Sequence, residues 1–258
     1  MMLQVKILTH SGSFHPDDVF AVSALLLLFE SKRVVPVIER SREPSSLASA
    51  DFLVDVGGEY NPDRNRFDHH QPGGAGKRGN GAPYASFGLV WRKFGEAICG
   101  SKETADKVER ELVEFIDVMD NGVGELRAVF GEVFPYSIGR AILAFNPDWR
   151  DASPDYDKAF REALSFSVPV LRRLIKEAAG EIEGARFAVA AYEAASDKRL
   201  VVMDRQYPWD NVLTAFPEPL FVVEPAAETP TLVYWRVKAV NAAPRSFKNR
   251  LDLPLEWV

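Results

Sequence analysis

Imidazole and carboxylate side chains of the kind that bind divalent cations gather in the first half of the chain. The set comprises His10, His15, Asp17, Asp18, Asp55, Asp68, His69, His70 and Asp120. All four histidines of the chain fall within its first 70 residues. Oxygen and nitrogen ligands without thiolates suit Mn²⁺, Mg²⁺ or Fe²⁺, and this set is larger than one ion needs. Two Mn²⁺ ions are therefore the expected cofactor, with Mg²⁺ or Fe²⁺ as alternatives, and such a pair typically hydrolyses phosphoesters.

Several of these residues also have an ordinary structural explanation. Asp17 and Asp18 suit the start of a helix, because carboxylates interact favourably with its positive end. Asp55 precedes a Gly-Gly turn, and Asp120 precedes the Asn-Gly pair that ends a predicted helix. The adjacent pair His69 and His70, preceded by an acid, is the element that most favours a functional site.

The elements expected around these residues form an α/β unit with a parallel sheet. Strands are predicted at 3–9, 34–39 and 51–56, with a buried helix over 17–29 between the first two. A fourth short strand leads into Asp68, His69 and His70, and a glycine-rich loop over 71–82 follows as a candidate lid. Ligands bind beyond the carboxyl ends of parallel strands. The acids and histidines that follow the first strand (10–18), the third strand (Asp55) and the fourth strand (68–70) are therefore expected to converge there. Further helices are predicted at 85–98, 102–119 and 137–144.

A cluster of Pro, Asp and Ser at 145–157 predicts a domain border. We expect a parallel-sheet domain over residues 1–150 and a smaller α+β domain over 151–258, with the active site in the cleft between them. The second domain is predicted to contain a helix over 156–179 and a mostly antiparallel sheet. Its strands are expected at 185–192, 200–203, 220–224 and 232–240.

The composition excludes several classes of protein. The chain has 258 residues and a formal net charge of −6, which argues against a broad basic surface for duplex nucleic acid. Its single cysteine, Cys99, cannot form an intramolecular disulfide, and the apolar stretch at 19–29 is too short to span a membrane. A cytoplasmic protein without a membrane partner is the expectation, and a homodimer is compatible with these features.

Basic residues provide candidates for contacts to a phosphate-bearing substrate. Lys77 and Arg78 lie in the glycine-rich loop, and Arg245, Lys248 and Arg250 lie near the carboxyl terminus. Such groups bind phosphates in nucleic-acid complexes. The alternative is a solvated polar rim without a binding role.

Long motifs carry a resemblance to a known family across almost the full chain. They are THSGSFHPDD (9–18), DVGGEYNPDRNRFDHHQ (55–71), IDVMDNG (116–122), FNPDW (145–149), PWDNVL (208–213) and FKNRLDLPLEW (247–257). These segments resemble the melanocyte proliferating gene family, and the Asp-His-His triplet resembles the related DHH phosphoesterase superfamily. The resemblance implies a DHH-like fold and a metal-dependent hydrolase, for which a 3′ to 5′ exonuclease activity on RNA has been proposed in eukaryotic members.

The resemblance also implies roles for individual residues. His10 or His15 would bind the first ion together with Asp17, and Asp55 would bridge both ions. The second ion would be held by His69, Asp120 and Asp18. His70 would face the substrate phosphate or protonate the leaving oxygen, and Asp68 belongs with it to the expected catalytic set. This chain has two adjacent acids where the superfamily usually has Asp-x-Asp, so the choice between Asp17 and Asp18 stays open.

Three functions are consistent with these features of the sequence. The first is an exonuclease or other phosphodiesterase acting on single-stranded RNA or short oligonucleotides. The second is a phosphatase or phosphodiesterase for a small nucleotide, which the acidic net charge accommodates well. The third is a metal-binding regulatory protein without turnover.

Overall fold

The computed structural model describes residues 5–228, 233–244 and 246–257. The chain divides into two compact units, Met1–Lys176 and Glu177–Val258. The division falls inside the long helix α7 (Tyr156–Ala194), downstream of the loop at 145–157 where the sequence predicted it. The two units are described separately below.

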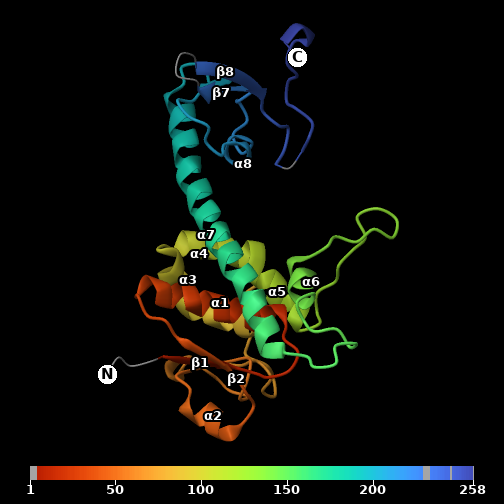
Figure 1. Ribbon diagram of the computed structural model, residues 1–258. Coiled ribbons are helices and arrows are strands. Elements are labelled where there is room, and N and C mark those ends of the chain that lie inside the picture. Colours follow the sequence, from red (N-terminus) through yellow and green to blue (C-terminus); the bar gives the residue numbers. More distant parts are fainter. Residues whose placement is uncertain (1–4, 229–232, 245, 258) are drawn as a thin grey trace. The chain divides into compact units, whose positions relative to one another are not determined.

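The first unit is a mixed α/β structure built on a five-stranded sheet (Figure 1). Its elements before α7 are β1 (Lys6–Thr9), α1 (Pro16–Ser31), β2 (Val37–Arg40), α2 (Pro44–Ser49), β3 (Phe52–Val54), β4 (Tyr60–Asn61), a 3₁₀ turn (Pro62–Arg64), β5 (Arg66–Phe67), α3 (Ser86–Cys99), α4 (Lys102–Val108), a π-helical turn (Glu109–Val113), α5 (Glu114–Asp120) and α6 (Ile138–Leu143). The strand order is β2-β1-β3-β5-β4. The first four strands in this order are parallel, and β4 alone runs antiparallel to its neighbour. The predicted parallel sheet is therefore confirmed.

Helices cover both faces of this sheet (Figure 1). Leu8 and Leu53 pack with Leu47 of α2 on one face. On the other face, Phe52 contacts Phe29 of α1 edge to face, with ring centroids 5.4 Å apart. Because successive strand residues point to opposite faces, strands covered on both sides read as continuous apolar runs.

Helix α1 is apolar nearly all round because it lies in the middle of the unit. Its residues from Asp17 to Leu25 are all buried, and it packs along α3. Pro16 occupies its first turn, where the missing N–H has no helical partner to lose. The helix predicted over 102–119 is present as α4, the π-helical turn and α5 in succession.

The second unit contains the end of α7, a three-stranded sheet and a short helix. Its strands are β6 (Leu200–Val202), β7 (Phe221–Glu228) and β8 (Val233–Ala239); α8 spans Asp210–Leu213 and a 3₁₀ turn spans Leu255–Trp257. β6 pairs parallel with β7, and β7 pairs antiparallel with β8. The core of this unit includes Trp209, Val201 and Val222.

The strand predicted at 185–192 is wrong, because this segment is helical and belongs to α7. Ala188 and Tyr192 are four residues apart and are both buried in the core of the second unit. That spacing is one turn of a helix, and the alanines of the segment favour a helix over a strand. Among the residues that the structure describes, no helix is long and apolar enough to span a bilayer.

Candidate metal centre

The register of three parallel strands brings the candidate ligands together. Thr9 of β1 lies opposite Val54 of β3, and Val54 lies opposite Phe67 of β5. The residue that follows each of these three is a candidate ligand: His10, Asp55 and Asp68. Three in-register strand ends therefore present three polar side chains side by side at one edge of the sheet, as the sequence predicted.

Asp55 lies at the centre of this edge. Its Oδ2 is 3.4 Å from His10 Nε2, and its Oδ1 is 3.5 Å from His69 Nε2 and 3.3 Å from His70 Nδ1. Its backbone has a φ of 54°, a left-handed conformation that aspartate adopts more readily than most residues. Burial raises the pKa of this carboxyl, but the three imidazoles outweigh it and hold the pKa well below its usual range.

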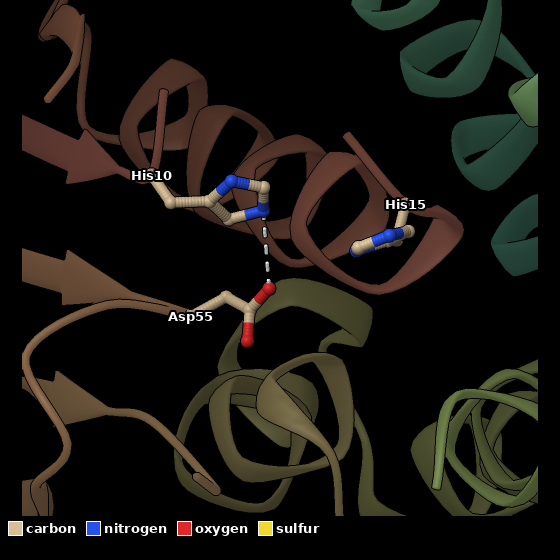
Figure 2. A group of neighbouring side chains, drawn as sticks. All are labelled: His10, His15 and Asp55. Atoms are coloured by element: carbon tan, nitrogen blue, oxygen red, sulfur yellow. Dashed lines mark ion pairs between the residues drawn. The ribbon is translucent and has the colours of Figure 1, made fainter. Parts of the chain in front are cut away.

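Three groups of side chains have the geometry to hold a cation. They are His10 with His15 and Asp55, Asp55 with His69 and His70, and Asp17 with His69 and Asp120; within each group the ligand atoms lie within 4.8 Å of one another. Figure 2 shows the first group, with His10 and Asp55 at adjacent strand ends and His15 at the start of α1. Asp55 and His69 each belong to two groups, which is the arrangement expected of a centre that holds more than one ion.

The two adjacent acids at the start of α1 have different surroundings. Both oxygens of Asp17 accept hydrogen bonds from the first turn of α3, from Ser86 N at 3.0 Å and Phe87 N at 2.6 Å. Asp18 Oδ1 accepts from the backbone N–H of His15 at 2.8 Å, which caps its own helix. Asp18 Oδ2 lies 3.3 Å from His10 Nε2. Asp18 therefore caps its own helix, whereas Asp17 caps α3, and both carboxylates border the centre.

His69 and Asp120 join the strand edge to the helices. His69 Nε2 lies 3.1 Å from Asp120 Oδ2, and Asp120 is the last residue of α5. Burial lowers the pKa of His69, but the Asp120 and Asp55 carboxylates outweigh it and raise the pKa to about 11. Burial also lowers the pKa of His10, but the Asp18 and Asp55 carboxylates outweigh it and raise the pKa to about 10.

Asp68 orients its neighbours. Its Oδ2 accepts a hydrogen bond from Gly58 N at 2.6 Å, and its Oδ1 accepts one from His70 N at 3.0 Å. Asp68 Oδ1 also lies 2.8 Å from His70 Nδ1. The His70 side chain is 62% exposed, so its ring is held at the base and reaches solvent at the other end. Asp68 is thus a positioning residue for His70.

The described side chains fit divalent cations. Asp18 Oδ2 and His69 Nε2 are buried without a hydrogen-bond partner among the described residues, and both face the centre. Burial raises the pKa of Asp17 well above its ordinary value, and the nearby Asp120 and Asp55 carboxylates raise it further. The burial of so many carboxylates costs free energy unless nearby positive charge compensates their negative charge. Nitrogen and oxygen donors without thiolates suit Mn²⁺, Mg²⁺ or Fe²⁺.

The basic residues predicted to contact substrate differ in their contacts and in their exposure to solvent. Arg78 is committed within the protein, because its guanidinium donates to Glu109 Oε1, Asp117 Oδ2 and Pro83 O. Arg250, in the second unit, donates to the carbonyls of Thr214, Phe216 and Pro219. Both guanidinium groups are therefore held by contacts within the chain, and their role in substrate binding stays a prediction. Lys77 and Lys248 are exposed, and Arg245 lies outside the described residues.

The Arg78 contacts predict a large effect on stability. The side chains of Arg78 and Asp117 are 8% and 0% exposed, and they pair at 2.7 Å. Arg78→Ala would leave Asp117 buried and unpaired, so we expect the free energy of unfolding to fall by about 3–5 kcal/mol. Lys77→Ala, the exposed neighbour, is expected to change it by less than about 0.5 kcal/mol. Urea unfolding of both variants measures the difference, and equal values would contradict this role of Arg78.

Three residues near the centre were missed by the sequence reasoning. Ser86 Oγ donates to Asp55 Oδ1 at 3.3 Å, and Asp117 Oδ1 accepts from Gly88 N at 3.0 Å. Arg140 of α6 lines a pocket beside His15, His70 and Asp120. The spacing of Asp117 three residues before Asp120 on one helix could have indicated that both face the same side. Nothing in the sequence around Ser86 or Arg140 carries such a signal.

Comparison with known proteins gives a match over nearly the whole chain. A family model described as "MYG1_exonuc: Uncharacterised protein family (UPF0160)" matches residues 6–258. The chain is 30% identical to "MYG1 exonuclease" of Rattus norvegicus, an alignment that covers 100% of this chain and 74% of the rat protein. It is 29% identical to "MYG1 exonuclease" of Homo sapiens, over 100% of this chain and 75% of the human protein. It is also 29% identical to a MYG1 protein of Schizosaccharomyces pombe, over 98% of this chain and 84% of the yeast protein. The chain therefore belongs to the MYG1 family.

Proposed function

We propose that this chain is a metal-dependent phosphodiesterase that removes nucleotides from the 3′ end of single-stranded RNA or short oligonucleotides, with two Mn²⁺ ions as its cofactor. The observation that carries the proposal is the position of Asp55, whose carboxylate belongs both to the His10 group and to the His69 group. The exonuclease names of the rat and human relatives support the same class of reaction. The acidic net charge of −6 is compatible with a substrate held at one local site.

The residues of this chain have distinct parts in such a reaction. Asp55 would hold both cations, with His10, His15 and Asp18 on one side and Asp17, His69 and Asp120 on the other. When bound, the cations supply an activated water and stabilise charge on the attacking and leaving oxygens. The bond from the water oxygen to phosphorus forms as the bond from phosphorus to the leaving oxygen breaks.

His70 is the group that we propose as general acid. Its contacts with the Asp55 carboxylate, more than the opposing effect of burial, raise its pKa, which favours the protonated form that a general acid needs. Asp68 holds one ring nitrogen, and the exposed end of the ring is free to give a proton to the leaving oxygen. In this arrangement Asp68 acts through His70.

His70→Ala is expected to lower kcat for RNA hydrolysis by about 10²–10⁴-fold, which is the usual contribution of a positioned general acid. Manganese content measured by elemental analysis is expected to stay at the wild-type value, because His70 is exposed and His69 is the buried partner of Asp55. Asp68→Asn is expected to lower kcat less. A loss of manganese from His70→Ala equal to its loss of activity would show that His70 is a ligand instead.

Product analysis with end-labelled RNA tests the proposed reaction. The Mn²⁺-loaded chain is expected to shorten a 5′-labelled single-stranded oligoribonucleotide one nucleotide at a time from its 3′ end. Addition of a chelator is expected to stop the ladder. Absence of hydrolysis of RNA, DNA oligonucleotides and free nucleotides alike, under Mn²⁺ and Mg²⁺, would contradict the proposal.

Salt dependence separates an exonuclease from an enzyme for a small nucleotide. A protein that contacts several phosphates of a strand loses affinity steeply as salt is added. We therefore expect kcat/KM for an oligonucleotide to fall much more between low and physiological salt than kcat/KM for a dinucleotide.

A further inference from the structure

A pocket of about 360 Å³ in the first unit adjoins the candidate metal centre. His15, His70 and Asp120 all line it. Each of these three belongs to a different one of the three ligand groups. A molecule in this pocket would therefore contact one residue of each ligand group.

An apolar wall of the pocket comes from α5, α6 and the segment between them. It is formed by Phe115, Ile116, Met119, Leu126 and Leu143. Flat aromatic and thioether groups of this kind provide surfaces on which a nucleobase stacks without regard to its sequence. A pocket for a phosphate alone would not need such a wall.

Arg140 is the only arginine or lysine among the residues that line this pocket. Its side chain is exposed, and within the described ranges its guanidinium has no ion pair or hydrogen bond. It differs in this from Arg78, whose donors are taken up by Glu109 and Asp117. A free guanidinium beside a metal centre is well suited to a phosphate oxygen.

The size of the pocket limits what it can hold. Ligand pockets commonly have volumes of about 300–1,000 Å³. A volume of about 360 Å³ is at the lower end of that range and suits one nucleotide, not a run of several. The rest of a bound strand would lie outside it.

We propose that this pocket binds the terminal nucleoside of the substrate, with the base against Phe115 and Met119 and with Arg140 on an oxygen of its phosphate. The proposal rests on the proposed phosphodiesterase function and names the part of the substrate that the first unit recognises. It makes a nucleoside 5′-monophosphate, the product released from a 3′ end, a ligand of the enzyme.

Calorimetric titration of the Mn²⁺-loaded full chain with AMP and with inorganic phosphate tests the pocket. The wild type is expected to bind AMP at least about tenfold more tightly than phosphate, because only AMP has a base that can stack on an aromatic ring. Phe115→Ala is expected to remove most of this preference. Arg140→Gln is expected to lower the affinity for both AMP and phosphate. Phe130→Ala, a matched change at an aromatic side chain that is 82% exposed and lies outside the pocket, is expected to change neither.

Leu143→Ala provides a second variant in case Phe115→Ala does not fold. Leu143 is 37% exposed, so its truncation threatens the core little, and the preference for AMP should again decrease. Equal affinity of the wild type for AMP and phosphate, or an unchanged preference in the folded wall variants, would overturn the pocket assignment.

Hydrolysis of methyl p-nitrophenyl phosphate distinguishes failure of this inference from failure of the proposed function. This ester has no nucleoside, and Phe130→Ala, which lies outside the pocket, is expected to hydrolyse it at the wild-type rate. A wild type that hydrolyses it but shows no preference for AMP would contradict the pocket and leave the phosphodiesterase intact. A wild type that neither hydrolyses it nor binds phosphate with Mn²⁺ would contradict both.

Discussion

Asp55→Asn is expected to lower kcat/KM for oligoribonucleotide hydrolysis by about 10³-fold or more, which corresponds to ~4 kcal/mol of transition-state stabilisation. The carboxylate of Asp55 belongs to two of the three ligand groups, so the loss of its charge weakens both cation positions together. The variant is expected to fold, because asparagine also tolerates the left-handed conformation that Asp55 has at φ 54°. Kinetics and elemental analysis of the same preparation measure the two effects.

Asp63→Asn is the matched control for this change. Asp63 is an exposed acid in the 3₁₀ turn between β4 and β5, so the same loss of charge occurs on the same unit away from the centre. Its activity and manganese content are expected to equal those of the wild type. If Asp55→Asn also retained both, Asp55 would not bridge a metal pair.

Removal of the metal is expected to abolish hydrolysis and to destabilise the first unit. Asp17, Asp18 and Asp55 are at most 4% exposed, and without cations their mutual repulsion opposes folding. Mn²⁺ at about 100 times its Kd should add ~2.7 kcal/mol to the free energy of unfolding, because it binds the folded chain in preference to the unfolded one. Urea unfolding with a chelator, and then with Mn²⁺, measures this difference.

The Asp55→Asn variant is the control for the stabilising effect of the metal. It should gain much less stability from Mn²⁺ than the wild type does. An unfolding midpoint of the wild type that does not move with Mn²⁺, or activity that survives complete chelation, would contradict a metal centre in this unit.

The sequence was sufficient to predict the edge of the sheet at which the candidate ligands meet. The segments before His10, Asp55 and Asp68 are short strands, and parallel strands place the residues that follow them at one edge. The in-register pairing of Thr9, Val54 and Phe67 then places these residues next to one another. Local patterns were enough here because each ligand directly follows its strand.

Contacts between distant segments could not be predicted in the same way. Asp17 accepts hydrogen bonds from Ser86 and Phe87, about 70 residues away along the chain, and its sequence neighbours predict only a cap for its own helix. Arg78 lies in a glycine-rich loop typical of an exposed lid, yet Asp117 and Glu109 bury its guanidinium. Such pairings depend on tertiary packing, which periodicity and turn signals do not encode.

Anomalous scattering at the manganese edge, from crystals grown with Mn²⁺, tests the central claim most directly. We predict two peaks about 3.5–4 Å apart, the usual spacing of a two-metal site. Asp55 should lie between them, with His10 beside one peak and His69 beside the other. A single peak that Asp55 does not touch, or peaks remote from the ends of β1, β3 and β5, would contradict this account.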